Sequence, residues 1–186
     1  MLVTLRARDG VGWLRTRLAY GALEAALAAS SRNDFRVAEF SVQTSHLHLV
    51  VEADGRAALT RDMRGLAIRC ARAVNRALGR CGALWGERYH ARALSTPRAV
   101  RTGLLYVIAN ARKHGRVRAG IDPCSSARWF DGFRWPRGGA SPDAGLAPGE
   151  RATRSPRTWL LRVGWRRHGL LSPDEGPAPP ARARSR

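Results

Sequence analysis

Residues His46–Ala53 (HLHLVVEA) form the segment that most restricts how this chain can fold. Apolar and polar side chains alternate along its first half, and successive side chains of a β-strand point to opposite faces of a sheet. His46 and His48 therefore share one face, about 7 Å apart along the strand, and the leucines between and after them share the other. Residues 36–43 predict a second strand, and the dipeptide at 44–45 predicts a tight antiparallel connection. The leucine face is expected to lie beneath helices. The apolar face of the second strand is expected to carry Ala38, Phe40 and Val42.

The remaining periodicities predict an alternating order of strands and helices. Thr96 is a suitable N-cap for the last helix of the series, with Pro97 at its first position and Gly115 just past its end. The order β-α-β-β-α-β-α predicts an α+β fold with a ferredoxin-like (split βαβ) antiparallel sheet and one extra helix. The expected elements are a strand at 1–8, a helix at 13–29, strands at 36–43 and 46–53, a helix at 60–79, a strand at 87–95 and a helix at 97–114.

The composition changes after residue 133. Residues 134–157 are rich in Pro, Gly, Ser and Arg, which is typical of a flexible linker. Residues 158–171 predict a short basic amphipathic helix, and residues 172–186 predict a disordered tail. Trp159 and Trp165 would either stack on DNA bases or attach this helix to the domain at 1–133. No apolar run reaches membrane-spanning length, so we expect a cytoplasmic protein.

Positive charge dominates the composition. The chain has 33 Lys and Arg residues against 14 Asp and Glu, giving a net charge of +19 and an isoelectric point near 11.7. Such a charge predicts a polyanionic partner, most commonly a nucleic acid. The almost complete absence of lysine suggests a GC-rich genome, which explains arginine over lysine but not the deficit of acids. The helix at 60–79 is expected to present an unpaired arginine face to phosphates, although a solvated helix face is the simpler alternative. The face comprises Arg61, Arg64, Arg69, Arg72, Arg76 and Arg80.

Four residues could form a chemical site. Two imidazoles at the spacing of His46 and His48 can bind one divalent ion, although two surface histidines would give the same pattern. In the helix at 97–114, Tyr106 and Asn110 are spaced i, i+4 and lie off the apolar stripe, so we expect neither on the buried side. Tyr106 could simply cover neighbouring surface, and the Asn110 amide could supply a third, oxygen ligand. The stripe comprises Val100, Leu104, Val107, Ile108 and Ala111.

Taken together, these motifs resemble the single-tyrosine HUH transposases, in the branch of the REP-associated tyrosine transposases and insertion-sequence-200-like transposases. The resemblance covers roughly residues 1–133, and Ser45 stands where that family often has Asn. Ser can close the same turn and accept a hydrogen bond. The matching segments are 41–52 (SVQTSHLHLVVE), 74–76 (VNR), 84–85 (LW), 88–90 (RYH), 106–110 (YVIAN), 113–114 (KH), 122–123 (DP), 125–127 (SSA) and 129–132 (WFDG).

The resemblance implies a metal-dependent enzyme that cleaves and rejoins single-stranded DNA, with a hairpin as its target. Mg²⁺ or Mn²⁺ would be held by His46, His48 and Asn110, and Tyr106 would form a 5′-phosphotyrosine and release a 3′-OH. It also implies a nucleoid-associated bacterial protein acting as a monomer or a homodimer. No general base is obvious in the sequence; His90 and His114 are candidates, although a surface or DNA-contacting role is the simpler interpretation of each. The DNA-binding residues would be the six arginines of the helix at 60–79 together with Arg88, His90 and Lys113.

Two other functions fit the same residues. A non-catalytic or domesticated nucleic-acid-binding module could use this topology, as RNA-binding domains do. A metal-dependent phosphodiesterase could use a metal-bound water, and would need the histidines but not Tyr106.

Overall fold

The computed structural model describes residues 1–113, 115, 120–135 and 151–177, and shows one antiparallel sheet of four strands in the order β2-β3-β1-β4. The predicted α+β class is confirmed. The strands are β1 (Leu2–Arg6), β2 (Phe35–Val42), β3 (His46–Ala53) and β4 (His90–Arg92). The helices are α1 (Arg17–Ala28), α2 (Gly55–Ala77), α3 (Pro97–Ile108), α4 (Asn110–Lys113) and α5 (Trp159–Arg162), with short 3₁₀ turns η1 (Ser126–Trp129) and η3 (Gly164–His168).

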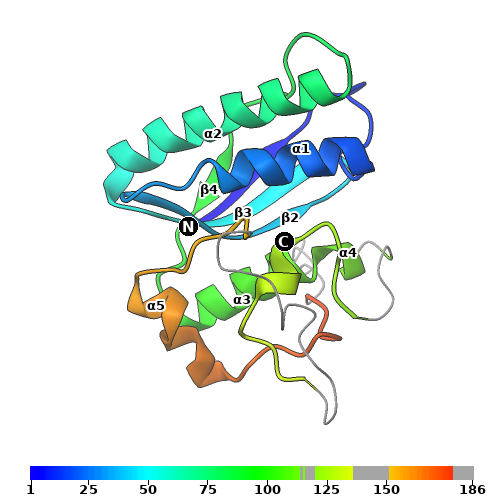
Figure 1. Ribbon diagram of the computed structural model, residues 1–186. Coiled ribbons are helices and arrows are strands. Elements are labelled where there is room, and N and C mark those ends of the chain that lie inside the picture. Colours follow the sequence, from blue (N-terminus) through cyan, green and yellow to red (C-terminus); the bar gives the residue numbers. More distant parts are fainter. Residues whose placement is uncertain (114, 116–119, 136–150, 178–186) are drawn as a thin grey trace, which may run out of the picture.

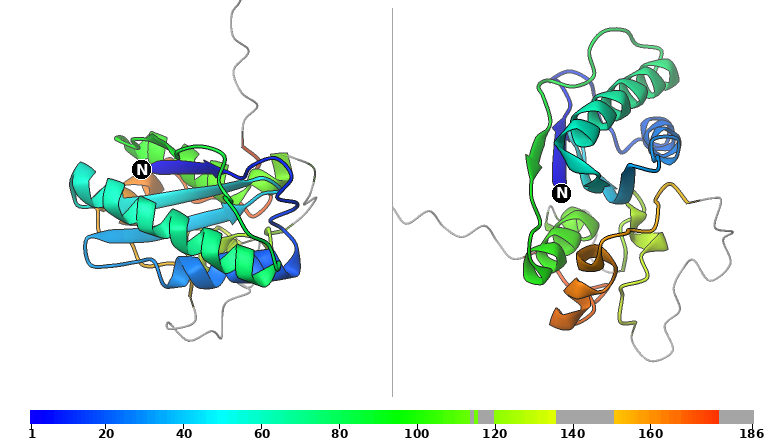
Figure 2. Two further views of the ribbon diagram at one scale, coloured as in Figure 1. Left: turned by 90° about the horizontal axis from the view of Figure 1, so that it is seen from above. Right: turned by 90° about the vertical axis from the view of Figure 1, so that its left-hand side faces the viewer.

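Helices cover the two faces of the sheet separately. In Figure 1, α1 and α2 lie on one side of the sheet, and α3, α4 and α5 lie on the other; the turned views of Figure 2 show the same division. None of the helices in the described ranges is long and apolar enough to span a membrane.

The leucine face of β3 forms the larger core. Leu47, Leu49 and Val51 are fully buried in the cluster that includes side chains of α1 and α2, as expected. Each such side chain contributes roughly 1.5–3 kcal/mol when fully buried. The second cluster joins Val50 and Ala38 to the apolar stripe of α3. Ala38 was expected on the opposite face, but the register shifts between Val37 and Glu39, and this bulge turns Ala38 toward α3.

Several elements differ from their predicted bounds. The first helix begins at Arg17 because Thr16 is its N-cap, accepting a hydrogen bond from the Ala19 N–H. Helix α2 begins five residues before the predicted start, since residues 56–58 (RAA) are strong helix formers. The strand predicted at 87–95 is reduced to the three residues of β4.

The helix predicted at 97–114 is interrupted. Thr96 caps α3 as expected, but α3 ends at Ile108 and a new short helix begins at Asn110, which is a weak helix former. The predicted stripe of α3 and α4 is buried, with exposures of 0–3 %. Tyr106 is half-buried, whereas Asn110 is completely buried. The expectation that Asn110 lies off the buried side is therefore wrong, because the break at Ala109 reorients the residues that follow.

The C-terminal segment packs on α3. Most of the predicted linker lies outside the described residues, but the Arg154 N–H donates to the Val37 carbonyl at 2.9 Å, so this part follows the β2 edge. The helix predicted at 158–171 is divided into α5 and η3 at Val163. Trp165 is 1 % exposed and stacks on Phe130, which favours attachment to the domain over DNA stacking for this residue, whereas Trp159 is 49 % exposed.

The beginning of the predicted disordered tail is held in place. Glu175 accepts two hydrogen bonds from Arg101, at 2.8 and 2.9 Å, and Arg112 donates to the Pro173 carbonyl at 2.9 Å. Residues 172–177 are thus part of the folded domain, and the prediction of disorder is wrong for them. Residues 178–186 lie outside the described residues.

Candidate functional site

Two histidine side chains of β3 lie side by side on the face that α3 covers. Their rings are parallel to within 2°, with centroids 5.9 Å apart. His48 pairs with Thr4 of β1, and the Thr4 hydroxyl is 3.0 Å from His48 Nδ1. The Ser45 hydroxyl is 3.0 Å from His46 Nδ1. When Nδ1–H donates to such an oxygen, the lone pair of Nε2 is directed outward, as in histidines that bind metals.

Tyr106 joins this pair from a different layer of the molecule. Its ring meets the His48 ring edge-on, with centroids 5.2 Å apart and planes at 74°. The expectation that the two motifs converge rested on the family resemblance, and this contact brings them together. The side chains of Ser41, His48, Thr4 and His90 form one row across the sheet, because their strands pair at these positions.

Tyr106 also lines a cavity of about 510 Å³. Arg98 and Thr102, which precede it at i−8 and i−4 on α3, line the same cavity, as expected for one helix face. His168 and Glu175 of the C-terminal segment complete the wall. No sequence signal predicted this convergence, since nothing in a linker-like composition indicates where the following helix is attached.

Asn110 presents an unmet hydrogen-bonding requirement. Its side chain is 0 % exposed, and within the described residues neither its amide oxygen nor its amide nitrogen has a hydrogen-bond partner. A buried polar group left in this state costs about 1–3 kcal/mol. In the described part of the chain, the Asn110 amide therefore makes no hydrogen bond to His46 or His48. The orphaned oxygen is the type of group that a hard divalent ion would satisfy.

No cluster of three or more His, Cys, Asp or Glu side chains that could hold a metal exists among the described residues. Such a cluster differs from a set of two histidines and one asparagine, because asparagine is not among these four residue types. A metal at His46, His48 and Asn110 would therefore depend on their two imidazole nitrogens and one amide oxygen.

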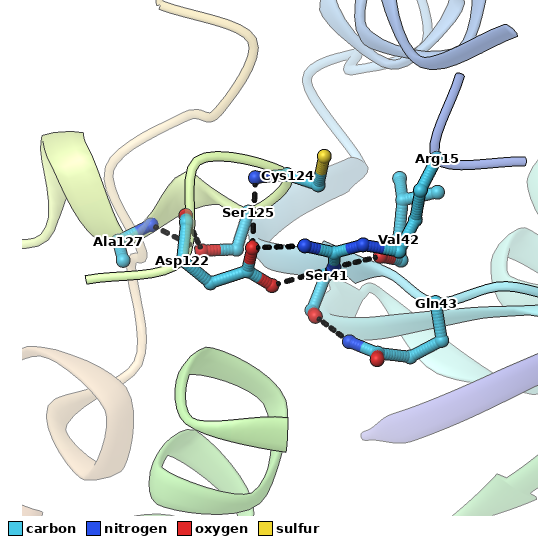
Figure 3. A network of polar contacts seen from close by, with 8 residues as sticks. All are labelled: Arg15, Ser41, Val42, Gln43, Asp122, Cys124, Ser125 and Ala127. Carbon is cyan, nitrogen blue, oxygen red and sulfur yellow. Dashed lines mark hydrogen bonds and ion pairs between the residues drawn. The ribbon is translucent and has the colours of Figure 1, made fainter. Parts of the chain in front are cut away.

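An ion pair fixes the turn that precedes the histidines. Figure 3 shows the Arg15 guanidinium between Asp122 and the end of β2. Arg15 donates to both carboxylate oxygens of Asp122, at 2.7 and 2.9 Å, and to the Val42 carbonyl at 2.8 Å. The hydrogen bond to Asp122 raises the pKa of Arg15. The Cys124 carbonyl accepts from the Val42 N–H at 2.8 Å, so the segment after α4 is joined to the same strand end. Sequence reasoning missed the role of Arg15, which nothing in its local sequence indicates.

The arginines predicted to bind DNA on α2 are on the far side of the sheet from Tyr106, with the layer of α1 (Figures 1 and 2). Arg61 is paired with Asp34 and Asp62, so the expectation of an unpaired face is wrong for this residue. Arg69 donates to Ser30, and Arg80 donates to Asn75. The exposed members without an ion pair in the described chain are Arg64, Arg72 and Arg76.

The other predicted contacts lie near β4 or beyond the described part. Arg88 is exposed and packs over the Tyr89 ring, and His90 is exposed beside Glu87. The side chain of Lys113 and the whole of His114 lie outside the described residues.

Comparison with known proteins gives one structural similarity. No family model matches the sequence, and no curated protein matches it. A solved structure described as a REP-associated tyrosine transposase bound to a REP hairpin matches with a TM-score of 0.52. The match covers 63 % of this chain and 69 % of that chain, at 22 % sequence identity. The chain therefore shares the fold of a REP-associated tyrosine transposase.

Proposed function

We propose that this protein is a metal-dependent enzyme that cleaves and rejoins single-stranded DNA through Tyr106. The proposed substrate is the single-stranded flank of a hairpin, since the structurally similar transposase was solved with a hairpin. The observation that carries the proposal is the edge-on contact between Tyr106 and His48. It joins a nucleophile on a helix to a ligand pair on a strand.

The proposed metal ligands are His46, His48 and Asn110, and the ion is Mg²⁺ or Mn²⁺. The residues fit this role because both Nδ1 atoms have hydroxyl partners and the Asn110 oxygen is orphaned among the described residues. A bound divalent ion would act there as a Lewis acid toward a phosphate oxygen. Two histidines and one amide leave open positions for DNA oxygens, whereas a structural zinc site requires four protein ligands.

Tyr106 performs the proposed transesterification. Its phenolic oxygen forms a bond to phosphorus while the bond from phosphorus to the 3′-oxygen breaks, leaving a 5′-phosphotyrosine and a 3′-OH. The phenol loses one proton and the 3′-oxygen gains one. His168 lines the same cavity as Tyr106, and is therefore a further candidate, beside His90 and His114, for the group that transfers this proton.

The cations that line the cavity of Tyr106 differ from those predicted on α2. Arg98 is exposed on the helix face of Tyr106, which suits contact with a phosphate near the cleaved bond. Arg101 lines the same cavity, but its guanidinium is already ion-paired with Glu175. The α2 arginines would then bind a more distant part of the DNA.

A covalent-adduct assay tests the proposal. The full chain is incubated with a 3′-labelled single-stranded hairpin and Mn²⁺, then separated under denaturing conditions, because the proposed 5′-phosphotyrosine keeps the 3′ fragment on the protein. We expect a labelled protein band that is lost in Tyr106→Phe and retained in Tyr89→Phe, a matched change away from the cavity. Binding without cleavage would favour the non-catalytic module. Cleavage that survives Tyr106→Phe would favour a phosphodiesterase with a water nucleophile.

A further inference from the structure

Glu39 of β2 is a carboxylic acid on the face of the sheet that α3 covers, beside the row that contains His48. It pairs with Val50 just after the bulge. Its Oε2 atom accepts a hydrogen bond from the Ser126 hydroxyl at 2.5 Å, and that hydroxyl accepts one from the Phe40 N–H at 2.8 Å. This leaves Oε1 as the atom available to another molecule.

Burial raises the pKa of Glu39 to about 8, so the neutral acid is the main form at pH 7. The hydrogen bond from Ser126 opposes this rise, as does the charge of Arg151, whereas the charge of Asp131 adds to it. A neutral carboxylic acid can donate a hydrogen bond as well as accept one, which a carboxylate cannot do. Because it is uncharged, it also does not repel the phosphates of a DNA backbone.

Glu39 lines a cavity of about 330 Å³ that is distinct from the cavity of Tyr106. On α3 its wall is Leu104, which lies two residues, or about 200°, from Tyr106 around the helix. The other apolar walls are Ala38, Phe130, Pro156, Leu161, Val163 and Trp165.

Polar groups of the C-terminal segment surround the same cavity. Arg162 is exposed, and Arg166 donates to Asp131 at 2.9 Å. A cavity of this size, in which several apolar side chains lie beside polar groups that converge on it, can hold a small ligand. Its combination of one hydrogen-bonding carboxyl with a nearby guanidinium suits a flat, uncharged ring attached to a phosphate.

We propose that this cavity binds one unpaired nucleobase of the DNA strand that flanks the hairpin, with Glu39 hydrogen-bonding the edge of the base and Arg162 contacting its phosphate. This inference rests on the proposed function, because only that function identifies the ligand as DNA. Enzymes that read an unstacked base use the same combination of apolar walls and edge hydrogen bonds. The site would select one position of the flank, separately from the chemistry at Tyr106.

An abasic scan combined with Glu39 variants tests the site. The probe is a fluorescent hairpin with single-stranded flanks, in which each flank nucleotide is replaced in turn by an abasic residue, and equilibrium anisotropy gives Kd for the full chain. We expect one position at which the abasic probe binds the wild type about tenfold more weakly. Glu39→Leu should bind intact DNA about tenfold more weakly than the wild type does, and the abasic residue at that position should not weaken its binding further. Glu39→Gln, which stays neutral and polar, should retain most of the preference.

The pH dependence supplies a second measurement. The charged groups facing Glu39 are Asp131, Arg151, Arg162 and Arg166. Because the neutral acid is the donor, the preference of the wild type should fall as the pH rises through about 8, and that of Glu39→Gln should not. Asp54→Asn makes the same acid-to-amide change at an exposed position and should behave as the wild type.

The outcomes separate this site from the proposed function. The base site would be overturned if no single abasic position weakened binding by the wild type. It would also be overturned if Glu39→Leu lost the same affinity as the wild type at every abasic position. Adduct formation by Tyr106 would be unaffected by that result. Coupling between Glu39 and one flank position without any adduct would support the base site and overturn the proposed chemistry.

Discussion

Replacing Glu39 with glutamine should change how stability depends on pH. The pKa of Glu39 rises from 4.5 to about 8 on folding. Between these values the folded chain holds a proton that the unfolded chain has released, so the free energy of unfolding falls as the pH rises. The contribution is fully present below about pH 4.5 and is lost by about pH 8. An amide does not titrate, so the Glu39→Gln variant lacks this loss.

The magnitude follows from the shift. One pKa unit corresponds to about 1.4 kcal/mol, so the two pH units from 5.5 to 7.5 correspond to about 2.7 kcal/mol as an upper limit. Glu39 keeps some exposed area, and screening by solvent reduces this to roughly 2 kcal/mol. Relative to the wild type, Glu39→Gln should therefore become more stable by that amount as the pH rises through this interval.

Urea unfolding of both proteins at pH 5.5 and pH 7.5 measures the effect. Because m is about 1–3 kcal/mol per molar urea for a small protein, the difference between their midpoints should change by about 1 M. Other titrating groups are common to both proteins and cancel in this difference. A difference between the two proteins that is the same at both pH values would refute the assignment of a neutral Glu39.

Three further substitutions test the site and the packing around it. Thr4→Val removes the hydroxyl that contacts Nδ1 of His48, and Mn²⁺ binding measured by calorimetry should weaken about 10–100-fold. Thr4→Ser keeps a hydroxyl and should retain the affinity. Asp122→Ala leaves the Arg15 charge without its partner and should lower the unfolding free energy by about 3–5 kcal/mol in denaturant titrations; a loss below about 1 kcal/mol would show that the pair does not fix the turn. Gly132→Ala places a Cβ 2.4 Å from ring atoms of Phe130 and Trp165 and should lower Tm. Gly21→Ala, in a helix, adds a Cβ that meets nothing within 4 Å and should raise Tm. Equal effects of the two glycine changes would contradict the packing described.

Local sequence patterns predicted the elements whose side-chain period is strong. Alternation over His46–Ala53 indicated the strand bounds that the structure shows, and placed its leucines beneath α1 and α2. The apolar stripe of α3 was also predicted, since its 3.6-residue period is regular. The contact between Tyr106 and His48 was expected only from the family resemblance, because no local pattern relates a helix face to a strand face.

The features that sequence reasoning missed depend on tertiary contacts. Periodicity identifies a polar helix face but not its layer, so it could not place the α2 arginines on the far side of the sheet from Tyr106. Glu39 has the sequence context of an ordinary strand acid, and its raised pKa arises from burial among segments more than 80 residues later in the chain. The burial of Asn110 follows from the break at Ala109, which helix propensity alone does not fix.

Peptide mapping of the protein–DNA adduct tests the central claim most directly. After incubation with hairpin DNA and Mn²⁺, the protein is digested with protease and nuclease, and the modified peptide is sequenced by mass spectrometry. We expect a nucleotide attached through a 5′-phosphate to Tyr106, with the modification dependent on His46 and His48. Cleaved DNA without any modified peptide, or a nucleotide attached to another residue, would contradict the account.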